Sequence, residues 1–217
     1  MKNLLNKELR LAASPLSYIF LVAALMTLLP GYPILMSAFF ICFGIFHSFQ
    51  HARESNDTLY TVLLPVRKKD FVRAKYMFTC MIQLAGFLLC AVLTAVRMSV
   101  LAQARPYVGN ALMNATPLFL AFVLLIFAAF NVFFVGGFFR SGYRIGIPFL
   151  SFGIACLVLI GAAETTPHLP GMEFFHTPSG ERLGLQFAIL ASSAAVYIIL
   201  TLVSCRKSEK RFERIDL

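Results

Sequence analysis

Six long apolar runs constrain this sequence more than any other feature, because most of the charged residues lie in the segments between them. About 20 mostly apolar residues are enough for a helix to cross a lipid bilayer. The chain is 59% hydrophobic and 13% charged, whereas soluble domains are about 45–50% apolar and about 25% charged. We therefore expect an all-α membrane protein with a single domain over 1–217 and six spans within 14–205, near 14–30, 33–52, 76–102, 112–138, 144–163 and 184–205.

The basic residues predict the orientation of these spans. Lys and Arg accumulate in the cytoplasmic loops of membrane proteins. If both termini lie in the cytoplasm, 16 of the 19 Lys and Arg residues fall on that side, and only Arg97, Arg105 and Arg182 fall on the other. Topology thus explains the formal net charge of +9, which does not indicate nucleic acid as a partner. We expect a multi-pass protein in contact with membrane lipid, with both termini cytoplasmic.

The two ends of the chain are expected to lie outside the bilayer core. Residues 1–13 can form an amphipathic helix in the plane of the membrane, and a frayed tail with basic anchors is the alternative. Residues 206–217 are expected to form a basic cytoplasmic tail. In the N-terminal helix the apolar side would carry Leu4, Leu5, Leu9 and Ala12, and the polar side Lys2, Lys7 and Arg10.

Motifs for nucleotide binding and for hydrolysis are absent from the sequence. No segment matches G-x-x-x-x-G-K-[ST], G-x-S-x-G or H-E-x-x-H. We therefore expect no enzyme activity and no cofactor in this chain. One alternative is a metal site or an intramembrane enzyme built on His47, His51, Glu54 and Asp57, whose two histidines are spaced i, i+4. The histidines could equally line the hydrated end of the second span, and the two acids could pair with basic residues of the following loop.

A few polar residues fall inside the apolar runs. Such residues form hydrogen bonds between helices or mark a functional site. Arg97 lies near the end of its span and is expected to extend toward the membrane surface. Carriers driven by ion gradients need acidic residues near the midplane, and the sequence places none there. The candidates for interhelical hydrogen bonds are Gln83, Asn114, Asn131, Ser192 and Ser193.

The segment between the second and third spans combines positive charge with apolar residues. Over 63–76 it reads Leu-Leu-Pro-Val-Arg-Lys-Lys-Asp-Phe-Val-Arg-Ala-Lys-Tyr. Pro65 is well placed to start a helix there. Binding to anionic lipid would need only the charge. The Leu-Leu-Pro-Val lead and the interleaved Phe71 and Val72 favour docking onto a partner protein, although the residues alone leave both interpretations open.

The same segment resembles the type-2 ABC exporter permeases, small membrane subunits whose ATPase is a separate chain. Their pattern is an acidic residue at the end of the second span, a Leu-Pro-Val run followed by basic residues, and a Lys-Tyr pair that opens the third span. Here Glu54, the run from Leu64 to Lys69, and Lys75 with Tyr76 supply it. Arg67 stands where the family usually has Ser. The chain is similar to the bacterial group that includes the phenol-soluble modulin exporter permeases.

The resemblance implies a function and a set of partners. The 59–75 loop would hold a coupling helix, seated in a groove of an ATPase, in a unit of two ATPases and two identical or related permeases. The ATPases would bind ATP and Mg, and amphipathic or antimicrobial peptides or hydrophobic compounds would be exported across a bacterial plasma membrane. A scaffold or sensor whose basic loop binds lipid or a regulator, without transport, is the alternative. The implied ATPase-coupling residues are Leu63, Leu64, Pro65, Val66, Arg67, Lys68, Lys69, Asp70, Phe71, Arg73 and Lys75, and Glu54 and Asp57 are candidates for gating or loop pairing.

Overall fold

The protein is described by a computed structural model that places residues 2–108, 112–141, 144–170 and 182–214. These residues form helices joined by short loops, which confirms the all-helical class for the described part of the chain. The elements, in order, are α1 (Lys2–Lys7), the π-helical η1 (Glu8–Ala12), α2 (Pro15–Ile19), the 3-10 helix η2 (Phe20–Leu28), α3 (Met36–Glu54), α4 (Asp57–Leu63), α5 (Lys68–Ser99), α6 (Arg105–Val108), α7 (Pro117–Ala129), the π-helical η3 (Phe130–Val135), α8 (Gly136–Arg140), α9 (Gly146–Thr165), the 3-10 helix η4 (Thr166–His168) and α10 (Leu183–Glu213).

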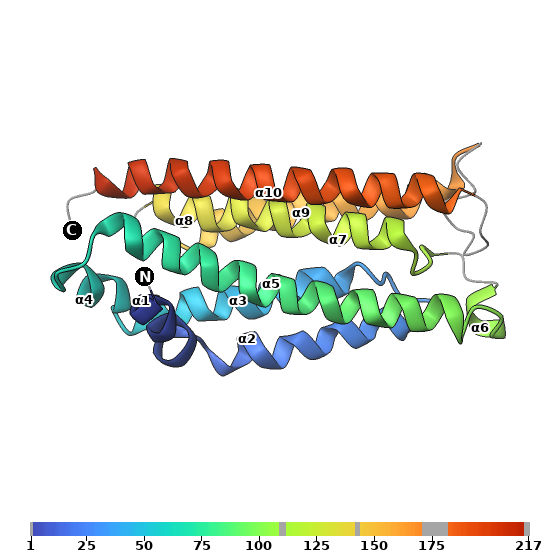
Figure 1. The fold of residues 1–217 in the computed structure, drawn as a ribbon, viewed down its shortest axis with the longest axis horizontal. Coiled ribbons are helices and arrows are strands. Elements are labelled where there is room, and N and C mark those ends of the chain that lie inside the picture. The colour runs from blue at the N-terminus through green and yellow to red at the C-terminus, as the bar shows by residue number, and fades with distance from the viewer. Residues whose placement is uncertain (1, 109–111, 142–143, 171–181, 215–217) are drawn as a thin grey trace.

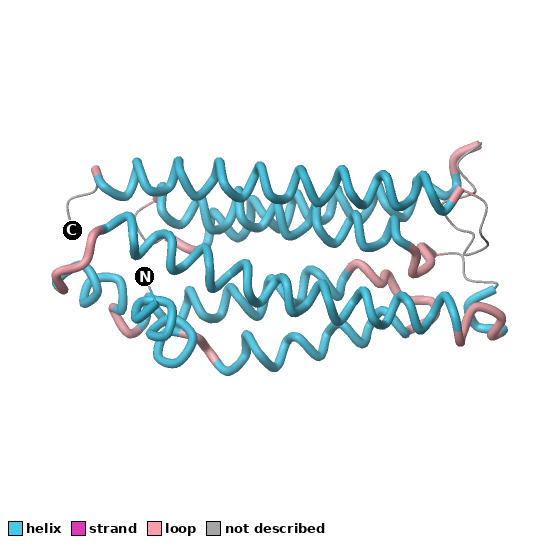
Figure 2. Tube along the Cα trace, in the orientation of Figure 1, coloured by secondary structure: helices cyan, strands magenta, loops and turns pink. Residues whose placement is uncertain are grey.

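The long helices run side by side in an elongated bundle (Figure 1). Figure 2 shows that the loops gather at the two ends of this bundle. The α7 helix and its continuation through α8 form the most enclosed rod, with 72% of its apolar window buried. Helices that are apolar on all sides, as α7 is, belong in the interior of a bundle. The outer faces of α9 and α10 are apolar and exposed, as surfaces in contact with lipid or another apolar partner must be.

Four of the helices are long and apolar enough to cross a membrane by themselves: α5, the rod from Pro117 to Arg140, α9 and α10. A fifth candidate is the bent pair Asn3–Ala12 and Pro15–Leu28, whose halves meet at 91°. The helix α3 falls outside this group because its last two turns carry His47, Gln50, His51, Arg53 and Glu54. The predicted count of six spans therefore stays a prediction.

The bend near the N-terminus arises from a local sequence signal. Ser14 is the N-cap of α2, and its side chain accepts a hydrogen bond from the backbone N–H of Leu16. Pro15 occupies the first helical position, where its missing N–H costs nothing. The backbone N–H of Ser14 donates in turn to Ser48 Oγ at 2.9 Å. The N-terminal helix is thus a separate segment, set at an angle to the rod that follows it.

The last helix is longer than its predicted span. Residues 206–213, predicted as part of a tail, continue α10 without a break. Two ion pairs hold this extension against the start of α5. Arg73 binds both carboxylate oxygens of Glu209, through Nε at 2.9 Å and Nη2 at 3.2 Å. Lys69 Nζ lies 3.0 Å from Glu213 Oε1.

The packing of α3 against α2 depends on a glycine. A Cβ atom at Gly44 would lie 2.7 Å from Phe20 Cβ and 3.2 Å from the backbone oxygen of Leu16. Gly153 on α9 has nothing within 4 Å of the same position and so serves as a matched control.

We predict that Gly44→Ala lowers the free energy of unfolding by about 1–3 kcal/mol, because overpacking forces the two helices apart. Gly153→Ala should leave it unchanged or raise it by up to about 1 kcal/mol, since alanine is the better helix former. Detergent-solubilised variants can be compared by SDS-induced unfolding followed by circular dichroism. Equal stability of the two variants would contradict the close packing described here.

Candidate coupling site

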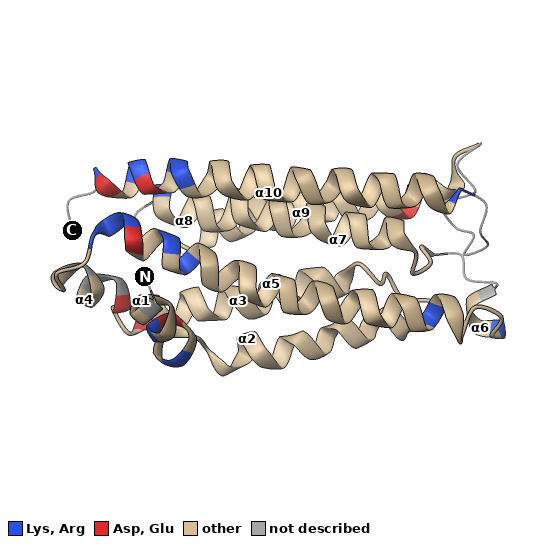
Figure 3. Ribbon diagram, in the orientation of Figure 1, with Lys and Arg blue, Asp and Glu red and all other residues tan. Residues whose placement is uncertain are grey.

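Charged residues gather at one end of the bundle (Figure 3). The N-terminal helix, α4, the start of α5 and the end of α10 all meet there (Figure 1). The opposite end carries only scattered charges, among them Arg97, Arg105 and Glu164. The predicted ATPase-coupling segment therefore lies at the charged end, together with the first helix, α1, and the end of the last helix, α10.

The coupling segment is two helices with a break between them. The short helix α4 ends at Leu63, and α5 begins at Lys68. Pro65 lies in the break, so the prediction that it starts a helix is wrong. The physical reason is the residue before it: Leu64 is extended, with φ −76° and ψ 157°, because a proline disfavours helical geometry at the preceding position. Pro65 thus terminates α4.

The break presents apolar side chains to the outside. Tyr60, Leu63 and Leu64 are 65%, 77% and 55% exposed. Pro65 and Arg67 are exposed beside them. We call these five residues the tip. The tip forms the outermost part of the charged end of the bundle, beyond the N-terminal helix (Figure 1).

The other predicted coupling residues divide by their burial. Lys69 and Arg73 are exposed and pair with α10 as described above. Val66, Lys68 and Asp70 are half-buried, whereas Phe71 and Lys75 are buried. Only part of the predicted set can therefore touch a partner directly, and the buried members act as support.

Beneath the tip lies a compact group of two bases and two acids, which we call the charge cluster: Lys7, Glu8, Asp57 and Lys75. Lys75 Nζ is 2.5 Å from Glu8 Oε2 and 3.5 Å from Asp57 Oδ2. Lys7 Nζ is 2.6 Å from Asp57 Oδ1 and 3.2 Å from Glu8 Oε1. It also donates to Thr61 Oγ1 at 2.7 Å. The cluster joins the continuous N-terminal segment α1–η1 to α4 and α5, which lie far from it in the sequence.

The central pair of the cluster, Glu8 and Lys75, is shielded from water. Glu8 and Lys75 are 1% and 2% exposed, and the ammonium group of Lys75 lies 5.7 Å from the ring centroids of both Phe49 and Phe71. Removing one partner from a buried ion pair leaves an uncompensated charge, which is far more costly than losing an exposed pair. The four side chains therefore hold the N-terminal helix and α4 in one position relative to α5.

Sequence reasoning found part of this cluster. It proposed that Asp57 pairs with the following basic segment, and the structure places Asp57 Oδ2 3.5 Å from Lys75 Nζ. Glu54, proposed for the same role, is exposed and accepts a hydrogen bond from Gln50 at 3.0 Å. The prediction missed Lys7 and Glu8 as partners. The signal was available, since Glu8 is an acid in an otherwise basic N-terminal segment.

His47 and His51 do not come together with acids. The ring of His47 packs among Phe20, Phe43 and Phe46, with centroid distances of 4.6–6.0 Å. His51 is exposed. Within the described ranges, no three His, Cys, Asp or Glu side chains are grouped so that they could hold a metal ion.

A second polar network crosses the middle of the bundle. Gln83 on α5 and Asn131 on η3 exchange two hydrogen bonds of 3.0 Å. Asn131 Nδ2 also donates to Thr201 Oγ1 at 2.9 Å, and Tyr197 OH donates to Gln83 Oε1 at 2.8 Å. The prediction that Gln83 and Asn131 bond between helices is confirmed. Ser192, another candidate, instead donates to a carbonyl of its own helix.

The π-helical turn extends this network toward the charged end. The carbonyl oxygen of Asn131 accepts hydrogen bonds from the N–H of Gly136, from Ser204 Oγ at 2.9 Å and from Tyr76 OH at 3.4 Å. Tyr76 OH also shares hydrogen bonds with Ser204 Oγ at 2.8 Å and Ser208 Oγ at 3.0 Å. Polar groups in a membrane interior must find partners within the protein. Here polar groups of α5, η3 and α10 form hydrogen bonds with one another.

Arg97 does not extend to the membrane surface as predicted. Its side chain turns inward and is 3% exposed. The guanidinium donates to the carbonyl oxygen of Thr27 at 2.7 Å and to Asn114 Oδ1 at 3.1 Å. It also lies 4.4 Å from the ring centroid of Tyr107. These acceptors were missed because they come from segments distant in sequence, and together they replace the contacts that water would offer.

The fold and the charged end define a multi-helix membrane protein with an exposed tip outside its spanning region. A family model described as ABC-2 family transporter protein matches residues 3–213, so the chain belongs to the ABC-2 family of transporter membrane proteins. Comparisons with curated protein sequences and with solved structures gave no significant match. The family makes the chain a transport subunit that is not itself catalytic, and implies an ABC ATPase as its partner.

We predict that Lys75→Met lowers the free energy of unfolding by about 3–5 kcal/mol, because Glu8 is left buried without its closest partner. Lys69→Met removes the same charge from an exposed pair and should cost no more than about 1 kcal/mol. The double variant Lys75→Met/Glu8→Leu should recover much of the loss. SDS unfolding of the purified variants measures all three, and similar losses for Lys75→Met and Lys69→Met would contradict the role of the cluster.

We also predict that Asn131→Ala lowers the free energy of unfolding by about 1–2 kcal/mol, since Gln83 and Thr201 lose their interhelical hydrogen bonds with the Asn131 amide. The control is Ser192→Ala, whose hydroxyl bonds only its own helix at an exposed position, and which should stay within about 0.5 kcal/mol of the parent. The same unfolding assay distinguishes them. A neutral Asn131→Ala variant would show that the network does not stabilise the bundle.

Proposed function

We propose that the chain is the permease subunit of an ATP-driven ABC exporter and that its tip docks into an ABC ATPase. The family membership supports the transporter class. The observation that carries the docking site is the combination of exposed Tyr60, Leu63 and Leu64 with basic residues at the charged end of the bundle. The sequence contains no phosphate-binding loop of its own, so the ATP that drives transport is bound by a separate chain.

The chemistry of the tip favours a protein partner over the membrane surface. A basic anchor for anionic lipid needs cations and gains little from a fixed shape. The tip instead presents three large apolar side chains on a short helix and an extended turn, with Arg67 next to them. Apolar side chains that are buried on docking supply affinity, and the surrounding positive charge selects a partner with an acidic rim.

The charge cluster provides the route by which a movement of the ATPase reaches the spans. Asp57 belongs to the same helix as Leu63, and it binds Lys75 on α5. A displacement of the tip therefore acts on α5 through ion pairs rather than through a flexible loop. From α5 the displacement passes to α10 through Arg73 and Glu209. Two-state rearrangement of such packed elements is the usual basis of coupling between sites.

The remaining parts of the proposal concern assembly, cargo and location. The working unit contains two permeases, identical or related, with two ATPases that bind ATP and Mg. The charged end faces the cytoplasm, since Lys and Arg are concentrated there, and the membrane is the bacterial plasma membrane. The N-terminal helix lies in the membrane plane. The exposed apolar faces of α9 and α10 suit hydrophobic or amphipathic cargo, including peptides, as in the exporters of phenol-soluble modulins.

The experiment is co-expression of the tagged chain with the ABC ATPase subunits of its own organism. We predict that Leu63→Ser/Leu64→Ser reduces co-purification of the ATPase at least tenfold and removes permease-stimulated ATP hydrolysis, because the apolar contact is lost. The matched control is Leu29→Ser/Leu169→Ser, which alters two exposed leucines away from the tip. Recovery of the ATPase at the parental level with the tip variant would refute the docking site. Failure of every ATPase to bind the parent chain would refute the proposed function itself.

A further inference from the structure

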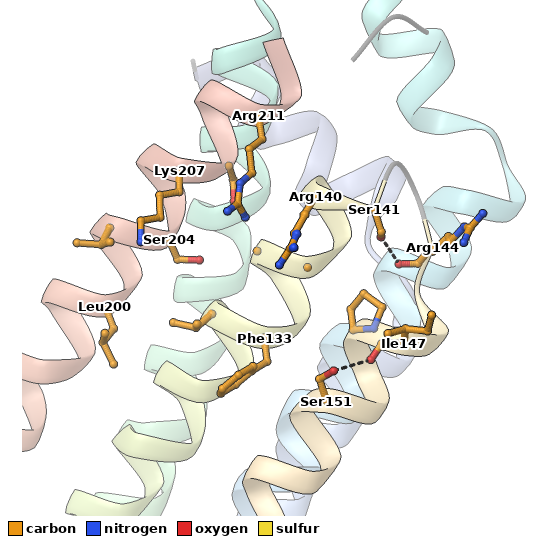
Figure 4. Close-up of a pocket in the computed structure, with 16 residues that line it drawn as sticks. Phe133, Arg140, Ser141, Arg144, Ile147, Ser151, Leu200, Ser204, Lys207 and Arg211 are labelled. Atoms are coloured by element: carbon orange, nitrogen blue, oxygen red, sulfur yellow. Dashed lines mark hydrogen bonds between the residues drawn. The ribbon is translucent and has the colours of Figure 1, made fainter. Parts of the chain in front are cut away.

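A cavity of about 620 Å³ lies between η3, α8, α9 and α10. Four basic residues line it: Arg140, Arg144, Lys207 and Arg211 (Figure 4). Figure 4 shows Arg140 and Arg211 extending into the same part of the cavity from α8 and α10. We call this cavity the basic pocket.

The pocket cations differ from the four cations at this end that form ion pairs. Lys7, Lys69, Arg73 and Lys75 are each paired with a carboxylate. None of the four pocket cations has an ion pair within the part of the chain that the structure describes. No acidic side chain lines the pocket either. Within the described residues the pocket therefore gathers positive charge without a carboxylate beside it, which makes an anion its natural ligand.

The pocket is apolar on the side that faces the membrane interior. Moving from Arg211 and Lys207 along α10 toward the middle of the span, the lining becomes Val203 and Leu200 (Figure 4). On the neighbouring rod Phe133 lies below Arg140 and is exposed. Cations at one end and exposed apolar side chains at the other match a molecule with an anionic head and a hydrocarbon tail.

Two adjacent glycines shape the inner wall. A Cβ atom at Gly136 would lie 2.7 Å from Ser204 Oγ, and one at Gly137 would lie 2.9 Å from Pro148 Cβ. These glycines let α8 approach α9 and α10 closely without filling the pocket. The wall is also ordered, since Ser204 and Ser208 bond Tyr76. The pocket is thus bounded by packed elements and not by loose surface chains.

We infer that the basic pocket binds an anionic membrane phospholipid, with its phosphate near Arg140, Lys207 and Arg211 and an acyl chain along Phe133 and Leu200. Basic pockets between membrane helices select anionic headgroups because each nearby cation adds to the attraction. The size lies within the usual range of ligand clefts. This inference does not depend on the export activity, because it rests on the lining of the pocket alone.

The test uses the purified full-length chain, delipidated in detergent and titrated with phosphatidylglycerol or phosphatidylcholine while native mass spectrometry counts bound lipid. The pocket variant Arg140→Gln/Lys207→Gln/Arg211→Gln is compared with Arg206→Gln/Lys210→Gln/Arg214→Gln, which removes the same charge from positions that do not line the pocket. All six positions are exposed, so both variants should fold, and circular dichroism checks this.

We expect the parent chain to bind phosphatidylglycerol more tightly than phosphatidylcholine. The pocket variant should lose affinity for phosphatidylglycerol by about fivefold for each charge removed, while the control variant changes by less than about twofold. Equal losses in the two variants, or equal binding of the two lipids by the parent, would overturn the inference. Displacement of the lipid by soluble glycerol phosphate at comparable concentration would also overturn it, since the site would then recognise a free phosphate and not a lipid.

Discussion

The buried ion pair between Lys75 and Glu8 is the contact on which the charged end of this protein depends. Neither side chain has water to solvate it, so each requires the other to be in place. Because Glu8 belongs to the N-terminal segment and Lys75 to a long spanning helix, the requirement draws two distant parts of the chain together. Asp57 and Lys7 complete the neutralisation and bring α4 with them. The position of the exposed tip thus depends on a charge cluster whose central pair, Glu8 and Lys75, is buried.

The same physical rule operates along the spans, where no water can satisfy a polar group. Gln83 and Asn131 pair with each other, and the π-helical turn at Asn131 supplies a carbonyl to Ser204 and Tyr76. At the opposite end Arg97 is enclosed by Thr27 and Asn114. Gln83, Asn131 and Arg97, polar residues in apolar runs, thus identify contacts between helices. In this protein Tyr76, Gln83 and Arg97 tie α5 to its neighbours at three levels.

The positive charges at this end of the molecule have two different environments, one beneath the tip and one in the basic pocket. Beneath the tip, Lys7 and Lys75 are neutralised by Glu8 and Asp57, and the resulting charge cluster supports α4. Around the pocket the described residues supply no acid, and the charge is left for an external anion. The helix α10 borders both regions, since Glu209 binds Arg73 while Lys207 and Arg211 line the pocket. A lipid held in the pocket would therefore contact α10, the helix that is ion-paired to α5.

The sequence by itself determined the helical class, the approximate course of the long helices, the concentration of charge at one end and the segment that resembles a coupling element. These follow from hydrophobic runs and from charge counting, which need no knowledge of distant contacts. Only the tertiary structure decided that Pro65 ends a helix, that Arg97 turns inward, that Lys7 and Glu8 meet Asp57 and Lys75, and that Arg140 and Arg211 share a pocket. The reason is that a buried charge is stabilised by whichever partner the fold brings within reach, and that partner can lie anywhere in the chain.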